Sequence, residues 1–281
     1  MVYYTLNKKT LNNIDKNLLE AWKKDVFISN IIQKKHIEKM KNVILELKNE
    51  NIKVIILKGL VLRELYPMPE LRNMRDGDIL VRYDDYEKAK KKLLDIGYEE
   101  NNHNNIHEEF TCTGNLEIEM HNKLVNNNYI HLDFCEFEKQ LWERSIKINF
   151  NGVMTNTLGK EDFLLHLIFH MAVHTKVTGF GLKQLYDLTL FIKYNSENIN
   201  WKEFKCKIAK YKLLKYTEGL IRIISKLFDI DILNILEEDS DIKENDTDLL
   251  LKNILRSGVY GKKLLNNNFE KLYRNNGFMI K

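Results

Sequence analysis

An Asn-Gly pair at residues 151–152 limits the fold more than any other short segment of the 281-residue sequence. The pair lies between KINF and VMTN, and Asn-Gly readily takes the positive φ angles of a type I′ hairpin. Two further segments, 107–113 and 116–121, alternate charged and apolar residues on either side of Gly114. Strands this close along the chain leave no room for a helical crossover, so they pair antiparallel. The sequence therefore predicts a mixed sheet and excludes a wholly parallel one.

Helical periodicity flanks these strands on both sides. From about Leu11 to Leu47 apolar residues recur every three or four positions, as in packed amphipathic helices. The pattern changes at KVIIL (53–57), a β-branched run that predicts a buried strand, and it becomes helical again from Glu161. We expect an α+β fold in three parts: a helical N-terminal leader (1–50), an α+β core (51–156) and a helical C-terminal domain (157–281).

The composition excludes several classes of protein. No apolar run approaches the roughly 20 residues that span a bilayer, and the N-terminus lacks the pattern of a signal peptide, so we expect a cytoplasmic protein with no membrane partner. Lys and Arg total 44 against 40 Asp and Glu and are spread along the chain, which is typical of a solvated surface rather than of a nucleic-acid-binding face. The three cysteines, Cys112, Cys135 and Cys206, lie far apart and indicate reduced thiols.

Asp76 and Asp78 are the first candidates for chemistry. They lie two residues apart in DGDILV, a predicted strand, so both carboxylates project from one face while Gly77 points the other way. That geometry suits a divalent metal ion. Asp-x-Asp recurs where solvated or capping carboxylates are expected, at 229–231, 239–241 and 246–248. The surroundings of the first pair single it out.

A turn suited to phosphate precedes the pair. Lys58 and Gly59 follow the strand KVIIL and lead into a helix, so free backbone amides, a glycine that allows close approach and a lysine charge meet there. Arg72 and Arg75 can add guanidinium contacts to the same anion. The alternative is that each of these two arginines forms an exposed ion pair, which contributes little to stability.

A third carboxylate is available on a neighbouring predicted strand. Glu117, Glu119 and His121 alternate with two apolar residues, so the three polar side chains share one face. Phosphoryl chemistry with two metals uses carboxylates that bridge cations about 4 Å apart, with cationic groups on the phosphates. Glu117 and His121 either line the same cleft or belong to a solvated strand face.

These segments resemble the uncharacterised nucleotidyltransferases of the polymerase β-like superfamily that carry a Leu-Lys-Gly turn. The resemblance covers roughly residues 52–192, in IILKGLVLRELYPMPELRNMRDGDILV, DDYEKAKKKLLDIGYE, LEIEMHNKL, EDFLLHLIFHMAVH and LKQLYDL. It implies a mixed-sheet nucleotidyltransferase core in which Asp76 and Asp78 bind metal and Glu119 supplies the third carboxylate. It also implies that Lys58 and Gly59 hold the triphosphate.

Two positions depart from the pattern of that group. The wider superfamily has Gly-Ser at the phosphate turn, whereas here Gly59 is followed by Leu60 and the serine contact is missing. The third carboxylate of the subfamily is commonly Asp in an Asp-Leu-His segment, and here it is Glu119 in Glu-Met-His. Because Glu is one methylene longer, we expect the metal position to shift or a metal to bind more weakly.

Three histidines recur every four residues in EDFLLHLIFHMAVH: His166, His170 and His174. A zinc site built from one helix is awkward, because the third imidazole lies about 12 Å along the axis from the first. We therefore expect these side chains to serve helix packing or substrate contact.

Together with the resemblance, the residues predict a nucleotidyltransferase that uses two Mg²⁺ ions to move a nucleoside monophosphate from an NTP to an acceptor hydroxyl, with release of pyrophosphate. Lys58-Gly59 lacks the G-x-x-x-x-G-K-S/T pattern of a P-loop, which favours attack on the α-phosphate over γ-phosphoryl transfer. Two alternatives stay open: a catalytically inactive nucleotide-binding or scaffold protein, and a toxin-like nucleotidyltransferase acting on RNA or protein. The acceptor, whether small molecule, saccharide, RNA or protein, does not follow from the fold.

Overall fold

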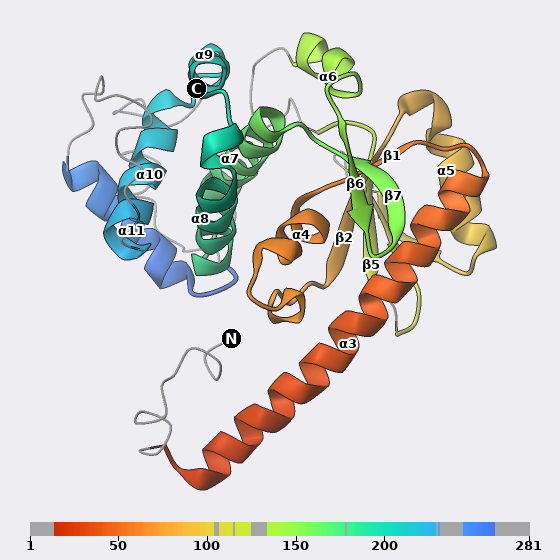
Figure 1. The fold of residues 1–281 in the computed structure, drawn as a ribbon, viewed down its shortest axis with the longest axis horizontal. Coiled ribbons are helices and arrows are strands. Elements are labelled where there is room, and N and C mark those ends of the chain that lie inside the picture. The colour runs from red at the N-terminus through yellow and green to blue at the C-terminus, as the bar shows by residue number, and fades with distance from the viewer. Residues whose placement is uncertain are drawn as a thin grey trace. The chain divides into compact units, whose positions relative to one another are not determined.

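The computed structural model describes residues 14–103, 107–114, 116–124, 134–177, 179–228, 230 and 244–261. The Asp-x-Asp pairs at 229–231 and 239–241 lie outside these residues. The chain forms two compact units, of which one comprises Met1–Asn122 with Lys147–Thr157 and the other Lys123–Ile146 with Leu158–Lys281. Figure 1 shows that the first unit carries the sheet and that the second is built mainly of helices.

Seven strands form one sheet in the order β3-β4-β5-β2-β1-β7-β6. β1 pairs antiparallel with β2 and parallel with β7, and β2 runs parallel to β5. β4 pairs antiparallel with both β3 and β5. The sheet is mixed, as predicted. The strands are β1 (Val54–Ile56), β2 (Asp76–Val81), β3 (Glu99–His103), β4 (Glu108–Thr111), β5 (Glu117–His121), β6 (Ile146–Phe150) and β7 (Val153–Thr157).

Two tight turns join neighbouring strands of this sheet. Asn151 and Gly152 connect β6 to β7 with φ angles of 48° and 89°, as a type I′ turn requires. The Asn149 side chain accepts a hydrogen bond from the Gly152 N–H at 2.7 Å. Gly114, at φ 71°, lies in the turn between β4 and β5. Both turns confirm the sequence prediction, whereas β3, an edge strand of mostly polar residues, was not predicted.

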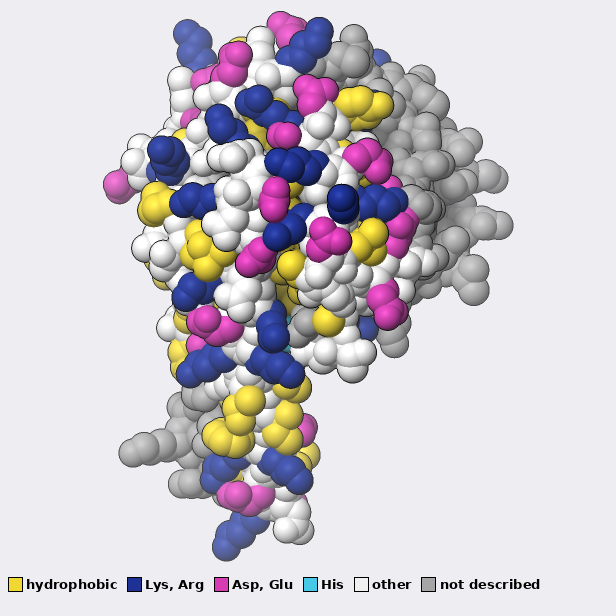
Figure 2. All heavy atoms as spheres, turned by 90° about the vertical axis from the view of Figure 1, so that its right-hand side faces the viewer, with side chains coloured by type: hydrophobic (Ala, Val, Ile, Leu, Met, Phe, Trp, Pro, Cys, Tyr) yellow, Lys and Arg dark blue, Asp and Glu magenta, His cyan; other side chains and the backbone are white. Residues whose placement is uncertain are grey.

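One continuous helix, α3 (Lys16–Asn49), replaces the several packed helices expected for the leader. No glycine or proline interrupts these 34 residues, so nothing breaks the helix. Its C-terminal half packs on the sheet through Met40, Ile44 and Leu47 and belongs to the same unit as the strands. Its N-terminal half exposes apolar side chains, which gather on the projecting part of the helix in Figure 2.

The other helices of the first unit are short. α3 and α5 (Tyr86–Asp95) cover one face of the sheet, and Gly97 ends the α5 segment as predicted. α4 (Lys58–Leu62) follows β1 directly, as expected after the Lys-Gly turn. Single 3₁₀ turns lie at Arg63–Leu65, Pro69–Leu71 and Tyr83–Asp85.

The second unit packs helices around an apolar core. α7 contacts α8 and α9, and α10 contacts α11. Phe163 of α7 stacks on Phe191 of α8 with ring centroids 4.9 Å apart. None of the helices in the described ranges is both long enough and apolar enough to cross a bilayer. The helices are α6 (Cys135–Leu141), α7 (Lys160–Val177), α8 (Leu182–Asn195), α9 (Trp201–Lys210), α10 (Leu214–Phe228) and α11 (Glu244–Ser257), with a 3₁₀ turn at Ser196–Asn198.

Candidate active site

Three carboxylates meet on the face of the sheet opposite α3. β2 and β5 run side by side with Asp78 opposite Glu119, and one oxygen from each of Asp76, Asp78 and Glu119 lies within 4.8 Å of the others. Gly77 points to the other face, where a Cβ would lie 2.9 Å from Leu116 in the core. The period-two geometry predicted for the pair is therefore present. Carboxylate oxygens are the ligands that Mg²⁺ prefers, so the cluster fits a divalent cation.

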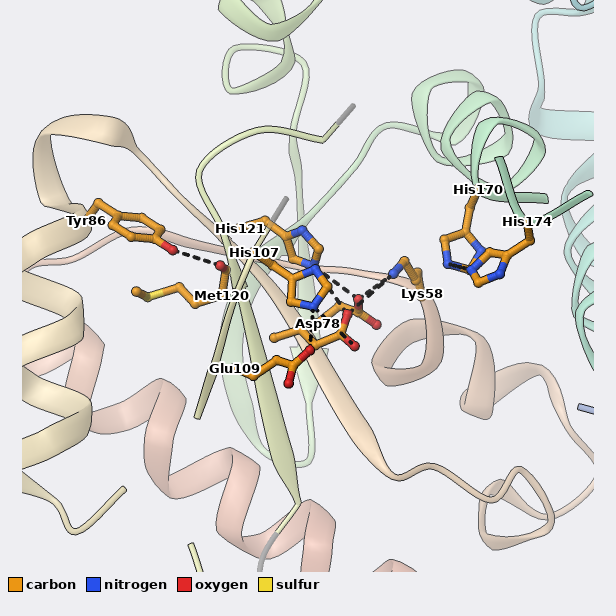
Figure 3. Close-up of polar contacts among 10 residues, drawn as sticks. Lys58, Asp78, Tyr86, His107, Glu109, Met120, His121, His170 and His174 are labelled. Carbon is orange, nitrogen blue, oxygen red and sulfur yellow. Dashed lines mark hydrogen bonds and ion pairs between the residues drawn. The ribbon is translucent and has the colours of Figure 1, made fainter. Parts of the chain in front are cut away.

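Lys58 lies against these carboxylates. Its Nζ is 2.5 Å from Asp78 Oδ1 and 3.9 Å from Glu119 Oε2, and Figure 3 shows the side chain reaching toward Asp78 from the turn after β1. Burial acts to lower the pKa of Lys58, but the two carboxylates outweigh it and hold the pKa above its ordinary value. Burial acts to raise the pKa of Asp78, yet Lys58 and His121 hold it well below its usual range. Both groups therefore carry their charges at neutral pH.

Arg72 packs against the Lys58-Gly59 turn. Arg72 is only 7% exposed, and a Cβ at Gly59 would collide with its guanidinium and lie 2.7 Å from Met74 Sδ. The turn therefore has room for glycine and for no larger residue while Arg72 keeps its place. The Arg75 side chain is exposed, and its backbone carbonyl accepts a hydrogen bond from the Glu117 N–H at 3.0 Å.

Arg63 is a buried cation that the sequence reasoning did not single out. It is 5% exposed, and its Nη1 lies 3.7 Å from Glu64 Oε1. Burial lowers the pKa of Arg63, and the nearby charge of Arg72 acts in the same direction, although a guanidinium stays protonated. Arg63 follows Gly59 by four residues, which is about one helical turn, and this spacing predicts that both lie on the same side of α4.

The sequence allows His121 either to line a cleft or to lie on a solvated strand face, and in the structure it is buried among the carboxylates. Its Nε2 lies 3.2 Å from Asp78 Oδ1 and 3.7 Å from Glu119 Oε2. Burial acts to lower the pKa of His121, but its contacts with the two carboxylates raise it above the ordinary value. Burial and the negative charges of Glu109 and Glu119 raise the pKa of Glu117. The face of β5 is thus part of the site.

His107 and Gln33 are two further residues at the site that sequence reasoning gave no role. His107 precedes β4, and its ring centroid lies 5.1 Å from that of His121. Gln33 of α3 is buried and makes two hydrogen bonds of 3.1 Å with the backbone of Met74, donating to its carbonyl and accepting from its N–H. These bonds fix the segment between Arg72 and Asp76.

The three histidines of α7 belong to the second unit. His166 is buried, and the Nε2 atoms of His170 and His174 lie 3.0 Å apart. Among the described side chains, two groups have the geometry to share one metal ion, Asp76-Asp78-Glu119 and His107-Glu119-His121. Neither group contains a histidine of α7.

Comparison with solved structures finds several partial matches. A crystal structure of the lincosamide antibiotic adenylyltransferase LnuA with lincomycin bound has 15% identity, covers 55% of this chain and 94% of that one, and has a TM-score of 0.40. A solution structure of the antibiotic-resistance factor ANT(2'')-Ia has 9% identity, 56% and 83% coverage, and a TM-score of 0.42. An antigenic nucleotidyltransferase-like protein from Paracoccidioides brasiliensis has 13% identity, 61% and 92% coverage, and a TM-score of 0.36.

No curated protein matches the sequence. A family model described as uncharacterised nucleotidyltransferase matches residues 1–229, which include every strand of the sheet and the whole carboxylate cluster. The chain is therefore a member of this family of uncharacterised nucleotidyltransferases and an enzyme of that class.

Proposed function

We propose that the protein transfers a nucleoside monophosphate from an NTP to an acceptor hydroxyl, with Mg²⁺ held by Asp76, Asp78 and Glu119 and with pyrophosphate as the leaving group. The observation that carries this proposal is the convergence of those three carboxylates from two parallel strands, with Lys58 beside them. When bound, the metal would lower the pKa of the acceptor hydroxyl and offset charge on the leaving phosphates.

The acidic residues of the site have one proposed role, which is to hold the metal ion. Asp76 and Asp78 point from one strand face, and Glu119 completes the set from the neighbouring strand. Each carboxylate would bind and orient the metal ion, because the hydrogen-bond ladder between β2 and β5 fixes the positions of these side chains. The longer Glu119 side chain lies near Lys58 and His121 as well as near the aspartates, so its orientation depends on all of these charged neighbours.

We propose that the cationic residues beside the carboxylates bind the triphosphate. Lys58 pairs with Asp78 in the structure, and with a divalent cation bound to the carboxylates its ammonium would be free to contact phosphate oxygens. Because Gly59 has no side chain, the Arg72 guanidinium packs directly against the turn, and we propose that it binds the phosphate from there. Arg75, exposed at the start of β2, is proposed to contact the same anion from solvent.

Isotope position tests which phosphorus moves. The full-length protein is incubated with Mg²⁺ and an NTP labelled at the α- or the γ-phosphate, with small molecules, saccharides, RNA and proteins offered as acceptors. We expect α label on an acceptor and γ label in pyrophosphate. Transfer of γ label to an acceptor would show that the reaction is a kinase reaction. Absence of any Mg²⁺-dependent NTP binding or turnover would favour the inactive scaffold, and α label on RNA or protein alone would favour the toxin-like enzyme.

A matched pair of substitutions tests the metal residues. Asp76→Asn removes one carboxylate of the cluster and is expected to abolish Mg²⁺-dependent NTP binding, measured by calorimetry, without loss of fold by circular dichroism. Asp84→Asn makes the same chemical change at an exposed position just beyond β2 and is expected to bind NTP like the unaltered protein. Equal NTP affinity in both variants would refute the assignment.

A further inference from the structure

A second set of ligand atoms adjoins the three carboxylates. One atom each from His107, Glu119 and His121 lies within 4.8 Å of the others. Glu119 turns one oxygen to each ring: Oε1 is 3.8 Å from His107 Nε2, and Oε2 is 3.7 Å from His121 Nε2. Ligands about 2.0–2.1 Å from a tetrahedral zinc ion are about 3.3 Å from one another. The two distances from Glu119 to the rings would each shorten by about half an ångström on coordination, and the two rings would move together from a separation of at most 4.8 Å between their ligand atoms.

The sheet holds these side chains in place. Glu119 and His121 are two residues apart on β5 and share its face. β4 runs antiparallel to β5 with Glu108 opposite Met120, so His107, one residue earlier, lies across from His121. The two imidazole rings are tilted by 52°, and in Figure 3 both lie beside the carboxylates in front of the sheet. Glu119 and His121 come from β5 and His107 from the residue before β4, all within a single compact unit.

The charges on this face favour a cation. Asp76 and Asp78, Glu109, Glu117 and Glu119 interact with one another or with the same two partners, Lys58 and His107. Five carboxylates thus gather around Lys58 and the two imidazoles. Glu109 Oε1 lies 3.2 Å from His107 Nε2 and adds a negative charge beside the set.

We propose that His107, Glu119 and His121 form a transition-metal site of the Zn²⁺ class beside the carboxylate cluster, with Glu119 shared between the two. The nitrogen donors decide the class of ion, because imidazole suits Zn²⁺ and its neighbours in the first transition row whereas Mg²⁺ prefers oxygen ligands. The two sets of ligands differ in Asp76 and Asp78 on one side and in the two histidines on the other. Substitutions can therefore separate them.

Cobalt reports on this site directly. The full-length protein, freed of metal by a chelator and studied without nucleotide, is titrated with Co²⁺. Four- or five-coordinate Co²⁺ with nitrogen ligands absorbs strongly in the visible range, whereas Co²⁺ held by six oxygens absorbs weakly. We expect one strongly absorbing equivalent that Zn²⁺ displaces. X-ray absorption of the Zn²⁺ form is expected to show two imidazoles, and this measurement needs no variant.

Variants assign the ligands. His107→Gln and His121→Gln are each expected to weaken Co²⁺ binding by at least about 100-fold, since even loss of an outer-shell partner costs about 10–100-fold. The double variant His170→Gln/His174→Gln removes the adjacent imidazole pair of α7 and is expected to bind Co²⁺ as the unaltered protein does. Circular dichroism checks that each variant is folded. Unchanged Co²⁺ affinity in folded His107→Gln, or loss of the signal in the α7 variant, would overturn the site.

The outcome is independent of the proposed reaction. Asp76→Asn is expected to keep the strong cobalt absorption while it loses Mg²⁺-dependent NTP binding. A protein that binds NTP with Mg²⁺ but gives no strong cobalt absorption would refute the transition-metal site alone. A protein that gives the absorption through His107 and His121 but never binds NTP would refute the proposed function alone.

Discussion

Replacement of Gln33 by leucine is expected to destabilise the first unit by an amount that the structure sets. Gln33 is 5% exposed, and its amide makes two hydrogen bonds of 3.1 Å, one to the Met74 carbonyl and one from the Met74 N–H. Leucine fills a similar volume but leaves both backbone groups buried without these partners. Each such group costs about 1–3 kcal/mol. We therefore expect Gln33→Leu to lower the free energy of unfolding by about 2–5 kcal/mol, allowing for partial relief by water.

The assay is urea unfolding followed by circular dichroism, with Gln140→Leu as the matched control. Gln140 is exposed and bonds to Arg144 in the second unit, so its replacement is expected to change stability by less than about 0.5 kcal/mol. Because Met74 lies between Arg72 and Asp76, the Gln33 variant is also expected to bind NTP more weakly. Suppose that Gln33→Leu lowers the free energy of unfolding by less than about 1 kcal/mol and leaves the dependence of that free energy on urea concentration unchanged. The two hydrogen bonds would then not hold the segment between Arg72 and Asp76 in place.

Two further predictions concern the turn and the buried charges. Gly59→Ala is expected to displace the Arg72 guanidinium, because the new Cβ would occupy its place. We expect NTP affinity to fall by about 10–150-fold, which corresponds to the loss of a charged hydrogen bond of about 1.5–3 kcal/mol. Unchanged NTP affinity by calorimetry would show that Arg72 does not contact the phosphates. Lys58 and His121 hold the pKa of Asp78 below its usual range, so this contribution to stability is complete above the ordinary aspartate pKa and is lost as pH falls below about 4. Urea titrations between neutral and acid pH are expected to show a smaller acid loss of stability in Asp78→Asn than in the unaltered protein, and equal losses would contradict the coupling.

Local sequence determined several features of this protein without help from distant residues. Asn151-Gly152 supplies the two positive φ angles of its hairpin by itself, and the absence of glycine and proline from 16–49 permits one long helix. The alternation in DGDILV places Asp76 and Asp78 on one face, because side chains of a strand point to opposite sides in turn. The same rule places Glu119 and His121 together on β5.

Only the tertiary structure decided which of these faces meet. Alternation tells which way a side chain points and says nothing about which strand lies alongside, so the register that sets Asp78 opposite Glu119 comes from the sheet order β5-β2-β1. Three contacts of the site join residues 14 to 43 positions apart in the sequence: His121 with Asp78, His107 with His121, and Gln33 with Met74. Contacts over such distances depend on packing, which no local pattern encodes. The division of the chain at residues 50 and 156 stays a prediction. The C-terminal half of α3, which precedes residue 50, packs in the same core as the strands, and such a shared core depends on long-range packing.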